Sequence, residues 1–191
     1  MESGGNDAEY WAGHYGTKID EAEVKFITGG TDTQWSPSFD YFNNVFLLQI
    51  QKYADIECKL IKRGYYPKGH GKVEIKIKPI YNLSDFNNFN ELLSHLKENA
   101  PKISLTERGH LIQIKGISHA SLNLQDANVA ERQAKAVEIA LSNYKCPKNI
   151  QTSYSDTLST GSGITLWAIC SKDKDEIDIK NPIRLGADAL G

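Results

Sequence analysis

The sequence lacks a long apolar run, a cysteine framework and a strong net charge. Its longest apolar run, Val45 to Leu48, is far too short to cross a bilayer, and the acidic, glycine-rich start does not resemble a signal peptide. The three cysteines, Cys58, Cys146 and Cys170, leave at least one thiol unpaired, which favours a reduced intracellular protein. They show no C-x-x-C spacing, which argues against a zinc site. We therefore expect a cytoplasmic protein that makes no membrane contact.

The familiar catalytic and nucleotide-binding motifs are also absent. There is no Walker loop, dinucleotide fingerprint, H-E-x-x-H or G-x-S-x-G. Gly161-Ser162-Gly163 lacks the strand-then-helix setting of a nucleophile elbow, and we interpret it as a hairpin turn. The five histidines are dispersed, so their spacing predicts no metal site. The net charge is −2 with a pI near 6.2, so any contact with nucleic acid needs a local basic patch.

One such patch lies at the start of the stretch Lys62 to Lys78. Its glycine-rich turn combines basic and aromatic side chains with no acid among them: Lys62, Arg63, Tyr65, Tyr66, Lys68, His70 and Lys72. Such a mixture suits a phosphate backbone that carries stackable bases, although an ordinary solvated hairpin explains the same residues. Arg63 and Lys68 are the stronger phosphate candidates because they stay charged, and the imidazolium of His70 could add to the site.

Hydrophobic periodicity predicts mixed helices and strands, an α+β fold. We expect a helix that starts at Ser38 and buries a stripe through Phe39, Phe42 and Phe46, and a second helix that starts at Ser84 or Asp85. The remaining expected elements are strands over 23–28, 56–62, 73–77, 111–114, 150–154 and 164–170, a helix from 126 or 128 to about 143, and another element opening at 183–190.

Taken in order, several segments resemble the RNA 3′-terminal phosphate cyclases across about residues 22–191. These segments are 27–32 (ITGGTD), 35–37 (WSP), 63–69 (RGYYPKG), 105–109 (LTERG), 116–120 (GISHA), 129–134 (VAERQA), 161–164 (GSGI) and 185–191 (LGADALG). The chain departs from the family pattern in three places. His70 stands where a third glycine is usual, Ser38 replaces the second proline of a pair, and residues 82–101 exceed the usual linker.

The resemblance implies a domain organisation. Residues 23–80 would be part of a repeated unit of helices on a four-stranded sheet, and residues 81–182 a small inserted α/β domain. Residues 183–191 would begin the return to the large domain, and residues 1–22 would be an unmatched leader.

The resemblance also implies a chemistry. Family enzymes use ATP and a divalent metal, attach AMP to a histidine, and convert an RNA 3′-phosphate to a 2′,3′-cyclic phosphate. None of the five histidines here matches that nucleophile, so we assign no catalytic residue and expect the chain alone to be inactive. Pro37 and Tyr41 are the implied contacts to the ATP base, and Arg63, Lys68 and His70 remain the candidates for RNA phosphate.

The implied partners are RNA 3′ ends, a second copy of the chain, or the missing part of a cyclase. An alternative stays open at this point: a non-catalytic RNA-binding or ribosome-assembly module of the same family.

Overall fold

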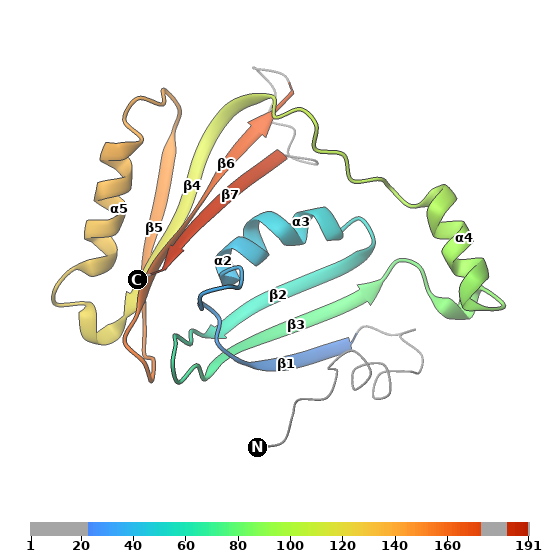
Figure 1. The fold of residues 1–191 in the computed structure, drawn as a ribbon, viewed down its shortest axis with the longest axis horizontal. Helices are drawn as coiled ribbons and strands as arrows, with labels where there is room; N and C mark the ends of the chain where they lie inside the picture. The colour runs from blue at the N-terminus through green and yellow to red at the C-terminus, as the bar shows by residue number, and fades with distance from the viewer. Residues whose placement is uncertain (1–22, 173–182, 191) are drawn as a thin grey trace.

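The computed structural model describes residues 23–172 and 183–190, which form two sheets and several helices (Figure 1). This arrangement confirms the predicted α+β class. The first sheet has the strand order β1-β3-β2 and contains β1 (Glu23–Gly29), β2 (Ala54–Lys62) and β3 (Gly71–Pro79). The second has the order β5-β4-β6-β7 and contains β4 (His110–Ser121), β5 (Lys148–Ser155), β6 (Ser162–Ser171) and β7 (Ile183–Leu190). The predicted leader, residues 1–22, lies outside the described residues.

Strands β2 and β3 form the hairpin predicted around the basic turn. Apolar residues face one another on one side of the pair, as where Ile56 lies opposite Ile77. On the other side Glu57 lies opposite Lys76, a cross-strand pair of opposite charge. This period-2 alternation gives the hairpin one face for the core and one for water.

Strand β1 pairs with β3 alone and is an edge strand of this sheet among the described residues. Its Phe26 and Ile27 are adjacent, so they lie on opposite faces of the sheet, and each is more than half exposed. The ammonium of Lys72 lies 4.5 Å from the centroid of the Phe26 ring, which covers part of that ring.

The first predicted helix is confirmed, but it buries a different stripe. It comprises α2 (Phe39–Tyr41), a π-helical turn (Phe42–Phe46) and α3 (Leu47–Ile50), and Ser38 caps it as expected. The amide of Leu47 bonds to the carbonyl of Phe42, five residues back, and this wider turn rotates the residues that follow. Val45 and Leu47 are buried as a result, while Phe46 of the predicted stripe is 48% exposed.

The second sheet is built around a crossover. Strands β4 and β5 are parallel and are joined through α5 (Val129–Ala140), whereas β6 pairs antiparallel with the other side of β4. The prediction of a hairpin turn at Gly161-Ser162-Gly163 is therefore wrong, because β4 lies between β5 and β6. Two parallel strands need a crossover connection, and the crossover through α5 places β5 on the side of β4 opposite to β6.

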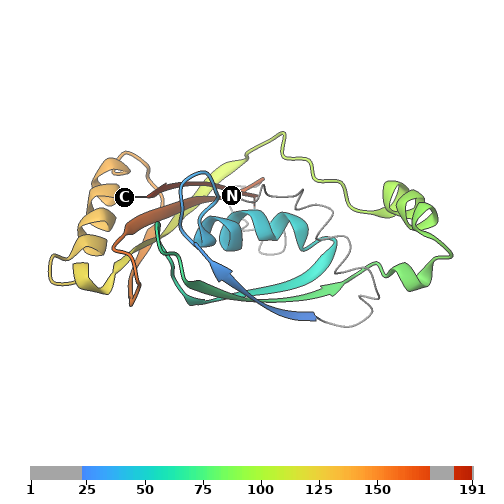
Figure 2. The ribbon, with the colours of Figure 1, turned by 60° about the horizontal axis from the view of Figure 1, so that its bottom comes forward.

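An arm from residue 80 to 109 connects the two sheets and carries α4 (Phe89–Asn99), which lies away from the rest of the fold (Figure 2). This helix starts later than predicted, because Asn88 caps it and Leu83–Asp85 forms a separate 3-10 turn. Across the part of the chain that is described, no helix has the length and apolar character needed to span a membrane.

The helix of residues 39–50 lies between the two sheets in both ribbon views (Figures 1 and 2). Its Val45 packs with Trp167 and Ile169 of β6 in a buried cluster. Its first residues are tied to the second sheet by hydrogen bonds, since Ser38 Oγ lies 2.8 Å from Thr165 Oγ1 and the Ser38 amide donates to Asp188 Oδ2 at 2.9 Å. The predicted domain division at residues 80 and 182 stays a prediction. Strand β7 pairs along β6 and so extends the second sheet.

Candidate functional site

A buried ion-pair network lies where the two sheets meet. Arg63, directly after β2, donates from Nη1 to both carboxylate oxygens of Asp32 at 3.1 Å and from Nη2 to Asp40 Oδ2 at 2.6 Å. Asp32 follows β1, and Asp40 occupies the first turn of α2. Each of the three residues is only 3% exposed. Three segments that are separate in the sequence therefore converge on one guanidinium.

The electrostatics of this network depend on Arg63. Burial raises the pKa of Asp40, because the charged form loses its water, and Arg63 opposes that rise. Burial alone would lower the pKa of Arg63, but the carboxylates of Asp40 and Asp32 outweigh it and raise that pKa. The guanidinium of Arg63 therefore favours the charged form of Asp40 against the effect of burial.

His119 joins the network from β4, in the second sheet. It is completely buried, and its Nδ1 lies 2.6 Å from the hydroxyl of Tyr65. Burial, together with the nearby Arg63, lowers its pKa to about 4 against the opposing pull of Asp32, so the ring is neutral at pH 7. Burial also raises the pKa of Tyr65 well above its usual value, so its hydroxyl keeps its proton and can donate it to Nδ1.

This hydrogen bond assigns the tautomer of His119. If Nδ1 accepts from Tyr65, the ring proton is on Nε2. Nε2 has no hydrogen-bond partner among the described residues, and it lies 3.4 Å from Asp32 Oδ1 and 3.9 Å from Asp40 Oδ2. The ring nitrogen therefore lies near both carboxylates without forming a hydrogen bond to either of them.

Asp32, Asp40 and His119 also have the donor types of a metal site, with donor atoms within 4.8 Å of one another. Arg63, however, already bonds three of the four carboxylate oxygens. A cation would have to displace the guanidinium, and the Nε2 proton of His119 would have to leave before that nitrogen could coordinate. The arrangement fits an internal ion-pair network and does not fit a metal.

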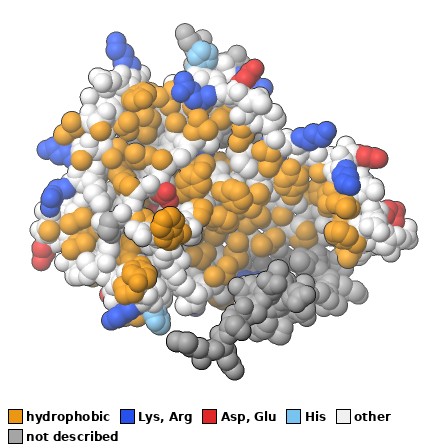
Figure 3. All heavy atoms as spheres, in the orientation of Figure 1, with side chains coloured by type: hydrophobic (Ala, Val, Ile, Leu, Met, Phe, Trp, Pro, Cys, Tyr) orange, Lys and Arg blue, Asp and Glu red, His pale blue; other side chains and the backbone are white. Residues whose placement is uncertain are grey.

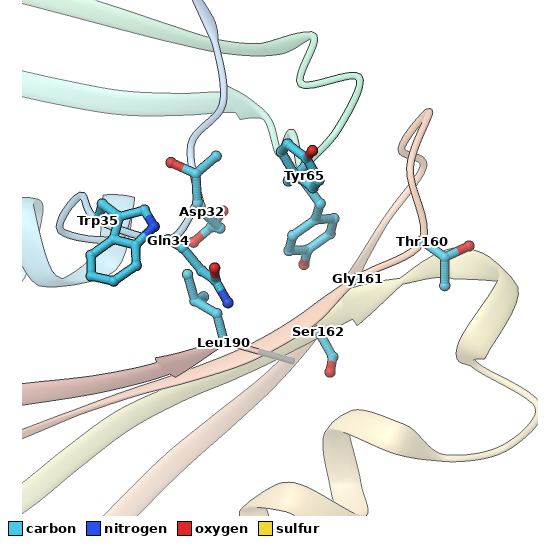
Figure 4. A pocket seen from close by; sticks show the side chains of 10 residues that line it. Asp32, Gln34, Trp35, Tyr65, Thr160, Gly161, Ser162 and Leu190 are labelled. Atoms are coloured by element: carbon cyan, nitrogen blue, oxygen red, sulfur yellow. The ribbon is translucent and has the colours of Figure 1, made fainter.

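A cavity of about 670 Å³ opens directly beside the network (Figure 4). Asp32 and Tyr65 belong to both the network and the cavity wall. The cavity is lined by Asp32, Thr33, Gln34, Trp35, Tyr65, Tyr66, Thr160, Gly161, Ser162 and Leu190. Its size lies within the range of small-molecule sites.

Glycine is required at two positions around this cavity. A Cβ on Gly161 would lie 2.5 Å from Cγ of Tyr65, so the β5–β6 connection packs its bare backbone against that ring. A Cβ on Gly64 would lie 2.2 Å from the amide nitrogen of Gly71, where the two sides of the basic turn meet. These close approaches hold Tyr65 between the two sheets.

The predicted site residues do not form one cluster. Arg63 is buried in the network, whereas Lys68 and His70 lie on the exposed turn that follows, and the Lys68 amide is fixed by Ser159 Oγ at 3.0 Å. Pro37 is exposed, and Tyr41 is half-buried and packs against the core cluster. None of these five residues lines the cavity. Their roles in binding phosphate or base stay predictions.

Sequence reasoning missed the network partners of Arg63 and the aromatic rim of the cavity. Asp32 and His119 lie inside matched segments, but nothing in those segments indicates that their side chains and that of Asp40 gather around Arg63. The sequence does show an arginine in the basic turn and an acid, Asp40, in the first turn of the helix that starts at Ser38, but it does not show that the two make contact. Trp35 stood inside a matched segment, but only the structure shows that its side chain is fully exposed.

Comparison with known proteins identifies the family. The model of the family described as RNA 3′-terminal phosphate cyclase matches residues 20–177. The chain belongs to the RNA 3′-terminal phosphate cyclase family. The segment that matches the cyclase model contains all five network residues, from Asp32 to His119.

Several archaeal RNA 3′-terminal phosphate cyclases are similar to this chain. The protein of Pyrococcus abyssi is 40% identical over 166 residues, which are 86% of this chain and 40% of that protein. The protein of Pyrococcus furiosus is 41% identical over 173 residues, 90% of this chain and 42% of that protein. The protein of Staphylothermus marinus is 38% identical over 172 residues, which are 86% of this chain and 41% of that protein. The chain thus spans about two-fifths of the length of these cyclases.

Proposed function

We propose that this chain is the part of an RNA 3′-terminal phosphate cyclase that binds the end of the RNA. In the complete enzyme the RNA 3′-phosphate would be converted to a 2′,3′-cyclic phosphate at the cost of ATP. The support is the family match over residues 20–177, together with a cavity beside a preorganised polar network. The similar archaeal proteins carry the name RNA 3′-terminal phosphate cyclase, which favours this proposal over a non-catalytic module of the same family.

The proposal assigns the nucleotide-accepting histidine to a part of the enzyme other than these residues. His119 is completely buried, and its Nδ1 is hydrogen-bonded to the hydroxyl of Tyr65. A histidine in this position is unsuited to attack a phosphorus atom. Incubation of the 191-residue chain with labelled ATP should therefore leave no covalent AMP after denaturation. A stable histidine–AMP adduct would refute this assignment.

We expect the phosphate contact to come from the exposed part of the basic turn. Arg63 would have to release Asp32 or Asp40 to take a phosphate, whereas Lys68 and His70 are exposed on the turn that also carries the cavity residue Tyr66. Filter binding should show tighter binding of 3′-phosphorylated than 3′-hydroxyl RNA. Lys68→Ala should weaken binding and reduce the salt slope by about 0.7, the value for one lost contact to a single strand.

A matched control for this experiment is Lys76→Ala, which removes an exposed lysine from β3, away from the turn. Its affinity and salt slope should equal those of the unaltered chain. Equal binding of the two RNA ends by the unaltered chain would contradict the proposed function.

ATP and a divalent metal belong to the proposal as cofactors of the complete enzyme. The resemblance assigns Pro37 and Tyr41 to the base of ATP, and the exposed ring of Pro37 offers an apolar surface for it. We assign no metal ligand to this chain, because the only described group of suitable donors is occupied by Arg63.

We also propose that the chain associates with a second copy through α4. Phe89 and Leu93 on this helix are 62% and 37% exposed, and Figure 3 shows hydrophobic side chains gathered across one face of the molecule. Large exposed apolar surfaces mark interaction sites. Light scattering should detect dimers of the unaltered chain, and the double variant Phe89→Glu, Leu93→Glu should be monomeric. An unaltered chain that is monomeric at all concentrations would refute this proposal.

We also propose a location in the reducing cytoplasm, which the free thiols of Cys58, Cys146 and Cys170 support.

A further inference from the structure

The cavity beside the network has an aromatic rim that the proposed function does not yet use. Trp35 is fully exposed and Tyr66 is 78% exposed, and both line the cavity. Trp35 also has a φ of 69°, in the left-handed region that a large side chain rarely adopts. An exposed indole held in an unfavourable backbone conformation indicates a ligand contact.

The loop that carries Trp35 is held at both ends. The amide of Thr31 donates to the carbonyl of Gly64 at 2.9 Å, and the amide of Phe39 donates to the carbonyl of Thr31 at the same distance. These bonds close the loop at its base, and Ser38 attaches it to β6 and β7. Trp35 thus lies at the tip of a braced loop, and its position does not depend on a ligand.

The opposite wall of the cavity is equally fixed. The amide of Gly161 donates to Ser121 Oγ at 2.8 Å, and its carbonyl accepts from the Ser121 amide at 2.9 Å. Thr160 Oγ1 accepts from Asn123 at 2.8 Å. Figure 4 shows Thr160 and Ser162 on this wall and Trp35 on the other side of Asp32. A ligand would enter a gap whose two sides are already in place.

The chemistry of the lining selects the kind of ligand. None of the residues that line the cavity is a lysine, arginine or histidine, and the carboxylate of Asp32 is buried against Arg63, so the wall offers no cation to a phosphate. Such a lining disfavours a phosphate group. Aromatic rings suit the faces of a planar heterocycle, while Thr33, Gln34, Thr160 and Ser162 offer hydrogen bonds to its edge.

From these observations we infer that the cavity binds a nucleobase, stacked on Trp35 and Tyr66, with the attached phosphate directed out toward the basic turn. The inference rests on the proposed function, because it requires a nucleotide ligand. The base of an RNA end and the adenine of ATP share this chemistry. The experiment therefore includes both.

Tryptophan fluorescence gives a direct test. The chain has three tryptophans, Trp11, Trp35 and Trp167, so a Trp11→Phe background leaves the exposed Trp35 and the buried Trp167. AMP and CMP should quench the solvent-exposed emission, and ribose 5-phosphate, which has no base, should not. Equal quenching by ribose 5-phosphate would overturn the inference, and so would no quenching by any nucleotide.

Affinity measurements on variants complete the test. Loss of one stacking contact predicts that Trp35→Ala weakens nucleotide binding about 5- to 150-fold, whereas Trp35→Phe largely preserves it. Because the indole is fully exposed, Trp35→Ala should keep the thermal stability of the parent. Tyr144→Ala, which removes an exposed aromatic residue outside the cavity, is the matched control. Unchanged affinity in Trp35→Ala would overturn the inference.

Separate titrations with ATP and with a 3′-phosphorylated oligoribonucleotide identify the source of the base, because Trp35→Ala should weaken only the ligand whose base enters the cavity. The results also separate the two proposals. A preference for 3′-phosphorylated RNA that persists unchanged in Trp35→Ala would retain the proposed function and reject the cavity. Base-dependent quenching without any preference for the 3′-phosphate would retain the cavity and reject the proposed function.

Discussion

Replacement of Arg63 by methionine should test the buried network most severely. Methionine has a similar length and fills much of the same space, so the main loss is the guanidinium. Arg63→Met would leave the carboxylates of Asp32 and Asp40 buried without the cation that now donates to both at 2.6–3.1 Å. The hydroxyl of Thr31, which donates to Asp32 Oδ2 at 2.6 Å, would be the nearest remaining donor.

The expected loss is large relative to the stability of a protein of this size. Removal of one partner of a buried ion pair costs about 3–5 kcal/mol, and total unfolding free energies are about 5–15 kcal/mol. For a chain of this length each kcal/mol corresponds to about 2–4 °C, so the melting temperature should fall by about 6–20 °C. Arg132→Met, on the exposed side of α5, is the matched control and should change stability by less than about 0.5 kcal/mol.

The loss should also depend on pH with a defined sign. Burial raises the folded-state pKa of Asp40, and Arg63 lowers it, so removal of Arg63 raises that pKa further. A carboxyl group with a raised folded pKa contributes its stability below its unfolded pKa and loses it as the pH rises through the folded pKa. The unfolding free energy of Arg63→Met should therefore be closest to that of the parent at acidic pH. The difference in unfolding free energy between the parent and Arg63→Met should therefore widen toward neutral pH, by up to about 1.4 kcal/mol per pH unit through Asp40.

Urea denaturation followed by circular dichroism between pH 4.5 and pH 8 would measure this gap. The triple variant Asp32→Asn, Asp40→Asn, Arg63→Met removes the charges together and should recover much of the loss at neutral pH. The reasoning fails if Arg63→Met lies within about 1 kcal/mol of the parent at pH 7, or if the triple variant is no more stable than Arg63→Met.

Three further predictions concern individual residues. Because the pKa of His119 is lowered to about 4, the parent should lose on the order of 3 kcal/mol of stability through this residue as the pH falls from 6.5 through 4. Urea denaturation of His119→Gln should show a weaker dependence of stability on pH in this range. An unchanged pH dependence would contradict the assignment. His70 has a φ of 58°, so His70→Gly should raise stability by about 1 kcal/mol by relieving left-handed strain, and calorimetry showing a lower melting temperature would oppose this. Gly161→Ala places a Cβ 2.5 Å from the Tyr65 ring and should cost about 1–3 kcal/mol, whereas Gly29→Ala meets nothing within 4 Å and should avoid that steric cost; equal melting temperatures for the two variants would show that the contact is not tight.

The sequence predicted the local elements well, because they depend on patterns within a few residues of one another. The alternation in β2 and β3 and the cap at Ser38 appear in the structure at the expected places. The stripe of the first helix was predicted incorrectly, because the π-helical turn Phe42–Phe46 inserts a residue that no period of 3.6 can anticipate. The late start of α4 at Phe89 followed from local competition, since Asn88 makes the better cap.

The site depends on distant pairings and was therefore less predictable. Arg63 was selected for its charge as a contact to RNA, but its position beside two buried acids depends on how β1, α2 and β2 converge. The misassigned hairpin has the same origin, because only the order of strands in the sheet shows that β4 separates β5 from β6. The glycines were more informative, since Gly64 lies where two backbones approach closely and Gly161 lies where the backbone packs against the Tyr65 ring.

Arg63 finds both of its carboxylate partners within the first sheet and the helix that follows β1, while the second sheet contributes the neutral ring of His119. The charged groups of the network therefore all lie on one side of the junction between the two sheets. Across that junction the second sheet contributes the uncharged ring of His119, and Trp167 and Ile169 pack against Val45. Because no ion pair of the network crosses the junction, ionic strength should have little influence on how firmly the two sheets adhere.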